Sequence, residues 1–484
     1  MSLRVSVWAL AAGVVALSGC TVGPNYKRPA APAPPAFKEE PPIDFKEAEA
    51  AGWKRSQPGD AFEKGKWWEV YRDPALNTLE EQVSISNQNV LQADAQYRQA
   101  TAEVRTSRTA LFPTVTGGAT ITESRNVSTG SRASFNLPVS ASWEPDIWGS
   151  IRRGVTANVA TAQSLAALLE NARLLYQAEL AQDYFGLHGS DGAMDLLQRT
   201  QTSYQEYLAL TRNRFAGGVA SDLDVAQAET QLYGVQSQLI DLGVTRAQFE
   251  HAIAVLTGKT PAELTIPVAT LSTLPPAVPV GLPSELLERR PDVAAAERRV
   301  AAANEQIGIA LAAFYPSLTI GGSAGLQNSS LLTLFTWPSR FWSVGPQLAQ
   351  TLFDAGRRRA VVAGQQAAYD ATVAAYRQTA LTAIQQVEDN LAALRILEQE
   401  AAKVQQTIDS SSRALAVSTA QYRAGTTSFL TVITSQATLL DAQRTAVTLL
   451  TRRLTASVLL IEALGGGWKA SKLPTLQDVS AKKP

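Results

Sequence analysis

The sequence predicts an α+β membrane protein that is built from two copies of one unit. Three observations lead to this prediction. Motifs in the first half of the chain recur about 200 residues later. Each half contains a pair of segments in which apolar and polar residues alternate, and each pair is followed by a very long run without proline. A repeat of this length indicates two large, pseudo-symmetric halves and not a short-period solenoid.

The repeat is carried by short matching motifs. The matching segments are Leu111–Thr116 with Phe314–Thr319, Gly149–Arg153 with Gly356–Arg359, and Phe215–Val225 with Tyr422–Val432. The spacing between partners changes along the chain, which predicts an insertion of four residues near residues 328–340, in a loop. Each half therefore has the same order of a helix, a pair of strands and a long helical hairpin.

Four segments are predicted to be transmembrane β-strands. They are Thr114–Thr122, Phe135–Glu144, Leu318–Gln327 and Trp342–Ala349. Apolar residues such as Val139 alternate with polar residues such as Ser140, as expected where one face meets lipid and the other a wet lumen. The residues expected to form an aromatic girdle are Phe335, Trp337, Phe341 and Trp342. The alternative is a pair of soluble hairpins that cover a core.

The helices of each half are bounded by proline and glycine. Val90–Leu111 and Val293–Phe314 are expected helices that stop before a proline. Pro291 and Asp292 suit the first turn of the second of these helices.

A much longer helix is expected over Arg152–Phe215, with a length of roughly 95 Å at 1.5 Å per residue. Gly217-Gly218 and Gly425 should turn the long helices back, into Asp222–Leu256 and Leu430–Leu464.

The N-terminus predicts a lipid anchor. A short positive leader and an apolar stretch end at Leu17-Ser18-Gly19-Cys20, which resembles the bacterial lipobox. Cys20 is the only cysteine of the chain. We expect it to carry a diacylglycerol thioether and an N-acyl group and no other cofactor to be bound. Thr21 favours delivery to the outer membrane. The alternative is an ordinary signal peptide with a chance cysteine.

The chain divides as follows on this interpretation. Residues 1–19 are the signal peptide and residues 20–72 the anchored tether, which is rich in proline near its start. Residues 73–264 form the first repeat, residues 265–283 a proline-rich linker, residues 284–466 the second repeat and residues 467–484 a tail.

Composition argues against several functions. Positive and negative side chains balance at 43 each, which gives no reason to expect a nucleic-acid partner. His188 and His251 are the only histidines, so a histidine-based metal cluster or catalytic triad is not expected and the chain is predicted not to be an enzyme. A periplasmic adaptor lipoprotein and a non-conducting trimeric structural lipoprotein stay open as alternatives. The first would need only one helical hairpin and no membrane strands.

Four membrane strands cannot close on themselves. An open sheet in lipid would leave edge N–H and C=O groups unpaired, at several kcal/mol each. The chain should therefore assemble with copies of itself, in a number that this argument does not give.

Several motifs together resemble the TolC-type outer-membrane factors, in their NodT/OprM-like lipoprotein branch. These motifs are Cys20–Tyr26, Trp67-Trp68, Asp73-Pro74 with Leu76, Arg289–Val293 with Ala296-Glu297, and the two turns at Gly218 and Gly425. The resemblance implies a homotrimer with a shared twelve-strand barrel in the bacterial outer membrane, continued by a helical tunnel into the periplasm. It implies a periplasmic adaptor and an inner-membrane efflux pump as partners. The implied function is the exit duct of a tripartite efflux system for small molecules such as drugs, with a protein secretion system as the alternative.

The resemblance also implies a gate at the helical turns. The family's first polar link falls on Asp224 and Tyr422, and we expect the Tyr422 hydroxyl to donate to the Asp224 carboxylate in the closed state. The arginine of the second link falls on Thr427. The paired gate carboxylates fall on Thr431 and Thr434, so an acidic ring is absent unless Asp222 or Asp224 replaces it. Both aspartates could instead cap a helix.

Overall fold

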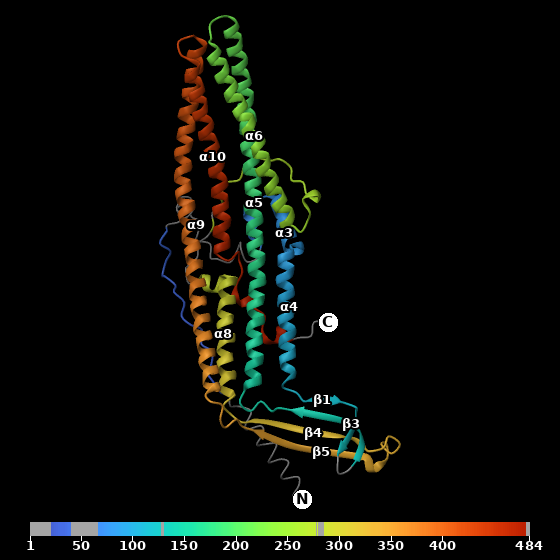
Figure 1. Cartoon of the computed structure of the whole chain (residues 1–484). Coiled ribbons are helices and arrows are strands. Elements are labelled where there is room, and N and C mark those ends of the chain that lie inside the picture. The colour runs from blue at the N-terminus through green and yellow to red at the C-terminus, as the bar shows by residue number, and fades with distance from the viewer. Residues whose placement is uncertain (1–20, 40–65, 127–129, 277, 279–284, 481–484) are drawn as a thin grey trace.

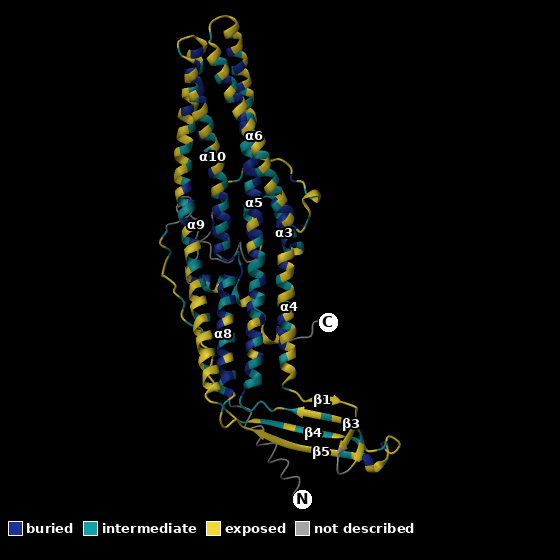
Figure 2. Ribbon diagram, in the orientation of Figure 1, coloured by how far each residue is buried: buried dark blue, intermediate teal, exposed yellow. Residues whose placement is uncertain are grey.

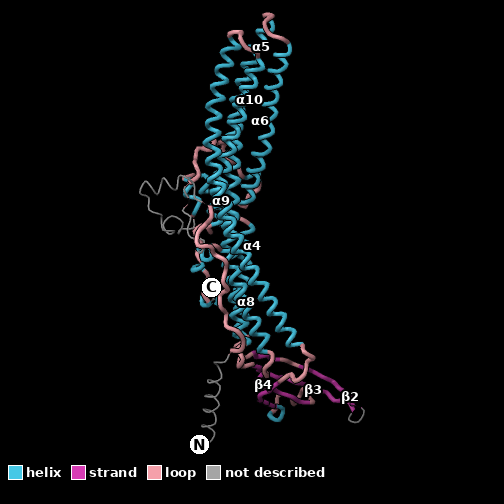
Figure 3. The backbone as a smooth tube through the Cα atoms, turned by 90° about the vertical axis from the view of Figure 1, so that its left-hand side faces the viewer, coloured by secondary structure: helices cyan, strands magenta, loops and turns pink. Residues whose placement is uncertain are grey.

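The computed structural model describes residues 21–39, 66–126, 130–276, 278 and 285–480. It is an elongated bundle of helices with all of its strands gathered at one end (Figure 1; Figure 3). Within the described residues, no helix combines the length and the apolar character that crossing a bilayer would require.

The two halves have matching helices, which confirms the internal repeat. The first half contains α3 (Pro74–Ser86), α4 (Gln88–Thr109), α5 (Ser150–Ala216) and α6 (Asp222–Leu256). The second contains α7 (Leu286–Arg289), α8 (Pro291–Ala312), α9 (Arg357–Arg423) and α10 (Phe429–Ala463). Both long helices have 67 residues and both returning helices have 35. The other helical elements of the described residues are short: α11 (Leu476–Ser480) and the 3-10 helices η1 (Trp67–Tyr71), η2 (Pro261–Glu263), η4 (Trp337–Ser339) and η5 (Ala470–Lys472).

Both long helices begin in the same way. Gly149 and Gly356 precede them with φ of 80° and 87°, a left-handed conformation that favours glycine. An aspartate upstream then accepts from the first turn. Asp146 accepts from the backbone N–H of Arg152 at 2.8 Å, and Asp354 accepts from the backbone N–H and side chain of Arg358 at 3.2 and 2.7 Å. The first N–H groups of a helix have no acceptor within the helix, and these carboxylates accept from them at the point where the strands connect to the helices.

The sheet contains four strands in effect. Its segments are β1 (Thr114–Gly117), β2 (Thr120–Asn126), β3 (Gly130–Trp143), β4 (Ser317–Asn328) and β5 (Arg340–Ala349). All neighbouring strands are antiparallel, in the order β1-β3-β4-β5, and β2 also pairs with β3. β1 and β2 share one register along β3, and the gap between them lies opposite Pro138, which has no N–H to donate. They form a single interrupted strand, as the sequence predicted.

The register aligns the predicted faces across the whole sheet. One row joins Val115, Ala141, Gly322 and Val344, and the next joins Thr116, Ser140, Ser323 and Ser343. In the polar row the hydroxyls of Ser323 and Ser343 lie 2.9 Å apart. Each strand thus presents its apolar residues on the same face as its neighbours. The predicted alternation is confirmed.

One member of the predicted aromatic girdle was assigned to the wrong face. Phe341 pairs with Gly325, and its neighbour Trp342 pairs with Ala324. Successive residues of a strand point to opposite faces, so Phe341 shares the face of Ser343, which is the polar one. The connection between β4 and β5, where the four-residue insertion was predicted, carries the other two aromatic residues, Phe335 and Trp337.

Residues 21–39, the described start of the predicted tether, are extended and bound along the helices. Arg28 donates to the carbonyl of Leu287 at 3.0 Å, and the backbone N–H groups of Lys38 and Glu39 donate to the Glu388 carboxylate at 2.6 and 2.8 Å. Figure 1 shows this segment running beside α9. On the other half, Val479 of α11 packs against α4 and α5. Residues 21–39 and α11 therefore cover equivalent grooves in the two repeats.

The largest core lies midway along the bundle, where Figure 2 shows the densest burial. Trp67, Tyr71 and Leu76 are at most 2% exposed there. Asp73 caps α3 by accepting from the N–H groups of Ala75 and Leu76, and Pro74 begins that helix. Trp67, Asp73, Pro74 and Leu76 belong to motifs that carried the family resemblance, and their roles here are in packing and capping.

A carboxyl group is buried without compensation in this core. Glu80 of α3 is 0% exposed, and neither of its carboxyl oxygens has a hydrogen-bond partner among the described residues. Burial raises the pKa of Glu80 well above its usual range, because the charged form is disfavoured away from water. The folded chain therefore keeps this proton to a higher pH than the unfolded chain does.

We predict that Glu80→Gln stabilises the protein at high pH. A carboxyl group with a raised folded pKa gives stability that is fully present below its unfolded pKa and is lost as pH rises through its folded pKa. Wild-type melting temperature should thus fall between pH 4 and pH 8 by more than that of Glu80→Gln, and the two should agree near pH 4. Glu81→Gln, which alters the exposed partner of Lys66, is the control and should retain the wild-type pH dependence. Equal pH profiles for wild type and Glu80→Gln would contradict the prediction.

Candidate functional site

The turns of the two helical hairpins lie side by side at the end of the bundle remote from the sheet (Figure 1). The first turn joins α5 to α6, and the second joins α9 to α10. Gly218 and Gly425 have φ of 72° and 78°, so each turn uses the left-handed conformation that ends a helix. Neither a Cβ on Gly218 nor one on Gly425 would meet another atom within 4 Å, so the backbone conformation accounts for these glycines and crowding does not.

The predicted hydrogen bond between Tyr422 and Asp224 is absent from the structure. Asp224 forms a capping box with Ser221: its carboxylate accepts from the Ser221 N–H at 2.9 Å and from the Ser221 hydroxyl at 2.8 Å. The Tyr422 hydroxyl is buried and has no hydrogen-bond partner among the described residues. The capping alternative for Asp224 is therefore the arrangement observed. Asp222 lies in the first turn of the same helix, where a negative charge is favoured.

Arg214 makes the contact between the hairpins that sequence reasoning missed. It lies in the last turn of α5, and its guanidinium donates to the backbone carbonyl of Tyr422 at 2.8 Å. The same group lies 4.5 Å from the centre of the Tyr422 ring. Tyr422 in turn packs on Phe429, with ring centres 5.3 Å apart. One arginine thus joins the end of the first hairpin to the aromatic pair of the second.

Two further hydrogen bonds connect the hairpins below the turns. Tyr207 of α5 lies 3.2 Å from the Thr419 hydroxyl of α9. Arg444 of α10 donates to the Gln238 side chain of α6 at 2.9 Å. An apolar cluster from both hairpins fills the space between them; its buried members include Tyr204, Leu208, Leu232, Tyr422, Phe429 and Val432.

The threonines of the second turn make local contacts. Thr427 donates to the Thr431 hydroxyl at 3.2 Å, and Thr434 donates to the carbonyl of Leu430 at 2.9 Å. Thr431 and Thr434 are exposed, and Thr427 is partly exposed. Their hydroxyls bear no charge, so a cation that approached this turn would meet no carboxylate from these positions.

The chain immediately after Cys20 is fixed where the sheet meets the helices. Cys20 itself and the signal peptide lie outside the described residues. Val22 donates to the carbonyl of Trp148 at 3.1 Å. A Cβ on Gly23 would lie 2.6 Å from the α-carbon of Gly308, and the φ of Gly23 is +105°, so only glycine fits.

The same joint contains a buried ion pair. Arg153 of α5 donates to Glu305 of α8 at 2.6 Å, and the two side chains are only 5% and 10% exposed. Asn304 donates to the carbonyl of Pro24 at 3.2 Å, which ties the N-terminal segment to the same helix. Breaking such a pair leaves an uncompensated buried charge, so this joint is held firmly.

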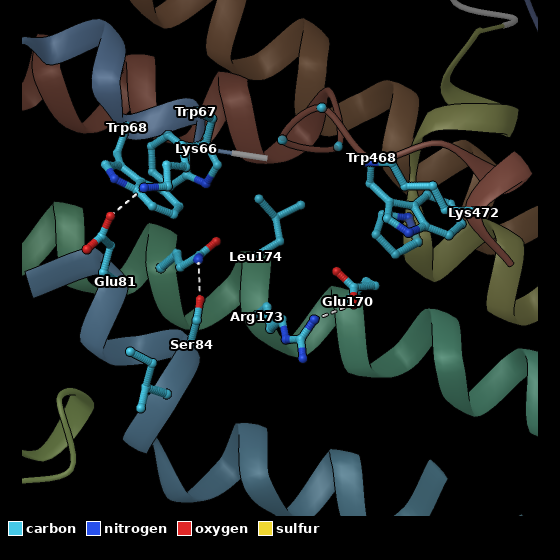
Figure 4. A pocket seen from close by; sticks show the side chains of 16 residues that line it. Lys66, Trp67, Trp68, Glu81, Ser84, Glu170, Arg173, Leu174, Trp468 and Lys472 are labelled. Carbon is cyan, nitrogen blue, oxygen red and sulfur yellow. Dashed lines mark hydrogen bonds and ion pairs between the residues drawn. The ribbon is translucent and has the colours of Figure 1, made fainter. Parts of the chain in front are cut away.

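A cavity of about 410 Å³ lies between η1, α3, α5 and the glycine-rich loop after α10 (Figure 4). Four of its charged lining residues form two ion pairs, and Lys472 is a further charged residue of the lining. Lys66 pairs with Glu81, and Arg173 pairs with Glu170 at 2.6 Å. Figure 4 shows both pairs along the wall of the cavity. The lining charges are therefore largely neutralised before any ligand is considered.

His188 holds the linker between the repeats. Its Nδ1 lies 3.0 Å from the Asp191 carboxylate and 3.0 Å from the carbonyl of Ala269. Arg246 donates to Asp191 at 2.7 Å and to the carbonyl of Ile266 at 2.7 Å. In the part of the chain that the structure describes, no group of three histidine, cysteine, aspartate or glutamate side chains is placed to hold a metal ion.

Comparison with known proteins accounts for nearly the whole chain. The family model for outer membrane efflux proteins matches residues 79–259 and 282–466, one stretch in each repeat. The antibiotic efflux pump outer membrane protein ArpC and the toluene efflux pump outer membrane protein TtgC, both of Pseudomonas putida, are each 31% identical to the chain, and each alignment covers 99% of both sequences. The solved structure of the outer-membrane channel OprN is 29% identical, covers 93% of this chain and 100% of its own, and superposes with a TM-score of 0.83. The chain belongs to the outer membrane efflux protein family and has the α+β channel fold of that family.

Proposed function

We propose that this protein is the exit duct of a tripartite efflux system, in which an inner-membrane pump and a periplasmic adaptor deliver small molecules to it. The observation that carries the proposal is the direct connection between two unlike parts. Apolar and polar rows run unbroken across four strands, and two of those strands lead straight into helices of 67 residues. Such a chain can offer one continuous path through a membrane and onward along a helical tunnel.

The sheet supports assembly into a homotrimer with a twelve-strand barrel. Within the described residues, the edge formed by β1 and β2 and the edge of β5 have no strand beside them. Unpaired backbone groups cost several kcal/mol each in lipid, so both edges require partners. Strands from further copies of the chain satisfy them in pairs, β5 of one copy beside β1 of the next.

The proposed cargo is a set of small, mostly apolar compounds. The relatives named above are described as antibiotic and toluene efflux proteins, and they align along the full length of this chain. The polar rows of β1, β2 and β3 carry mainly threonine, serine and asparagine, with Arg132 as a single charged residue and no dense charge ring. Such a lining discriminates little among small solutes, so the pump selects and the duct conducts.

Conductance is the direct test. The purified full-length protein in a planar lipid bilayer should give discrete single-channel currents. A non-conducting structural lipoprotein or an adaptor would give none. An outer-membrane component for protein secretion would conduct but would not restore drug resistance to cells that lack an efflux duct.

The lipid anchor on Cys20 suits the position of its neighbours. Thr21 packs against Gly149, at the joint between sheet and helices. A lipid attached one residue earlier would start beside the membrane end of the helices, where acyl chains can enter the near leaflet without stretching the chain.

We predict that Cys20→Ser abolishes labelling by radioactive palmitate and prevents normal removal of the signal peptide. Cys20 is the only cysteine, so no other thiol can accept the diacylglycerol. Undiminished label would refute the lipid anchor. A second mutant, Thr21→Ser, keeps a small hydroxylated residue beside the anchor and should label as wild type does.

We predict that arginine substitutions at two neighbouring residues, Val139 and Ser140, have different effects because the two side chains lie on opposite faces of the sheet. Arginine at Val139, in an apolar row, should cost about 2–4 kcal/mol if it lies near the middle of the bilayer. Arginine at Ser140, in the polar row, should leave stability almost unchanged and shift ion selectivity toward anions. Unfolding in lipid vesicles and reversal potentials measure these effects. Equal losses of stability in the two variants would contradict the assignment of faces.

The gate is proposed to depend on Arg214. Its hydrogen bond to Tyr422 involves a charged donor, a class that contributes roughly 1.5–3 kcal/mol. Three copies in a trimer would bias the resting state toward closure by several kcal/mol. Asp222, Asp224, Thr427, Thr431 and Thr434 are then secondary gate candidates that shape the turns.

We predict that Arg214→Ala raises the open probability of single channels and sensitises cells to large antibiotics. Tyr422→Phe should differ little from wild type, because the hydroxyl that it removes has no hydrogen-bond partner among the described residues. Arg212→Ala is the matched control. Arg212 pairs with Glu229 of the same hairpin at 2.6 Å, so its loss removes a charge without separating the two hairpins. Wild-type conductance in Arg214→Ala, or an equal rise in Arg212→Ala, would exclude Arg214 as the link.

A further inference from the structure

We propose that the connection between β4 and β5 binds a phosphorylated lipid of the outer leaflet, with Arg340 as the ligand of the phosphate group. The connection, residues 329–339, lies at the end of the sheet farthest from the helices (Figure 1). With the helices in the periplasm, this end meets the outer leaflet. The inference rests on that part of the proposed function, and its test is chosen to fail separately from it.

The connection is ordered by buried side chains and by hydrogen bonds within it. Ser339 and Leu334 are each only 2% exposed. Asn328 donates to the Ser339 hydroxyl at 2.6 Å, and that hydroxyl donates to the carbonyl of Thr333 at 2.8 Å. The 3-10 helix η4 then leads directly into β5. Side chains on such a connection keep their positions.

Its outer surface is apolar to an unusual degree for an exposed turn. Leu332 is 95% exposed, Trp337 is 75% exposed and Phe335 is 72% exposed. The surface is continuous with the apolar face of β5, where Trp342 and Val344 are also exposed. Large exposed apolar patches mark surfaces that meet a membrane or a partner. Because this patch extends the lipid-facing rows, acyl chains are the occupant that fits it.

Arg340 adds a cation to that apolar face. It is the first residue of β5 and lies two residues before Trp342, so both point to the same face. Its guanidinium lies 4.1 Å from the centre of the Trp337 ring. No carboxylate among the described residues forms an ion pair with Arg340. A guanidinium held on an indole keeps its fork of N–H donors free for an anion.

Arginine and phosphate match in charge and in shape. The planar guanidinium can donate two parallel hydrogen bonds to phosphate oxygens, and it is weakly hydrated enough to work beside apolar groups. Free phosphate would satisfy the arginine but would leave Leu332 and Phe335 against water. A lipid phosphate satisfies both, since its acyl chains cover the leucine and the phenylalanine while its head group reaches Arg340.

The other hairpin of the sheet supplies a control. Arg132 lies near its tip and pairs with Ser124. It alternates with Ser131 and Ala133 and so shares the polar face with Ser134. Arg132 therefore offers the same charge at the same end of the sheet, on the side away from lipid.

The experiment measures binding of lipid A to the full-length lipidated protein by native mass spectrometry. Lipid A with both phosphates is compared with lipid A from which both have been removed. Wild type should bind the phosphorylated form, and Arg340→Gln should bind it about tenfold more weakly or worse, as expected for the loss of a charged hydrogen bond. Arg340→Lys should be intermediate, because a lysine keeps the charge but loses the fork. Arg132→Gln should equal wild type.

Each other outcome overturns the inference. Equal binding by wild type and Arg340→Gln, equal binding of phosphorylated and dephosphorylated lipid A by wild type, or an equal loss in Arg132→Gln would exclude a phosphate site at Arg340. Displacement of lipid A by millimolar inorganic phosphate would show a simple anion site in its place. Single-channel conductance of the same samples separates the two proposals. Normal currents without a difference in lipid binding refute this site alone, and absent currents refute the duct.

Discussion

The sheet has two open edges, and this constraint governs the rest of the molecule. Backbone groups at the edges of β1, β2 and β5 can be satisfied in lipid only by other strands. The alternation of apolar and polar rows fixes which face meets lipid, and register ties all four strands to that choice. Neither half of the repeat could meet this requirement alone. The proposed assembly follows from a sheet whose two edges have no partner strand within the described residues.

The joint between the sheet and the helices imposes a second structural constraint. Strands and helices differ in direction and diameter, so the chain must turn sharply without exposing helix N–H groups. Gly149 and Gly356 provide the turn, and Asp146 and Asp354 accept from the first helical turn. In the first repeat the N-terminal segment is pressed into this joint, where Gly23 leaves no room for a side chain. Anchor, sheet and helices are thereby held in one place.

Periodicity was enough to predict the architecture, because long elements average over many residues. The helix over Asp222–Leu256 has the predicted ends, and the helices predicted over Arg152–Phe215 and Leu430–Leu464 begin and end within two residues of prediction. Single contacts were not predictable in the same way. Phe341 was placed in the aromatic girdle because it is aromatic, although the period of two assigns it to the polar face. The hydrogen bond between Tyr422 and Asp224 was predicted only because both residues match the family's gate motif, and Asp224 instead binds Ser221. The capping box with Ser221 is local, and a local partner is available to the aspartate at a lower cost in entropy. Arg214 carried no signal at all, since its partner is a backbone carbonyl of a residue about 200 positions away.

The chain ends make the two repeats unequal, and this inequality has a consequence for docking. The hairpin turns of the two repeats are close copies, so three chains would present six nearly equivalent hairpins at the tip. Lower on the bundle, the groove between α8 and α9 holds the N-terminal segment, where Tyr26 and Ala31 pack on Val293 and Tyr376. The equivalent groove between α4 and α5 holds α11 instead. A partner that touches only the tips would meet six similar sites, whereas one that reaches the middle of the bundle would distinguish two kinds of groove. The same duplication that builds the tunnel therefore sets a limit on how far up the bundle sixfold recognition can extend.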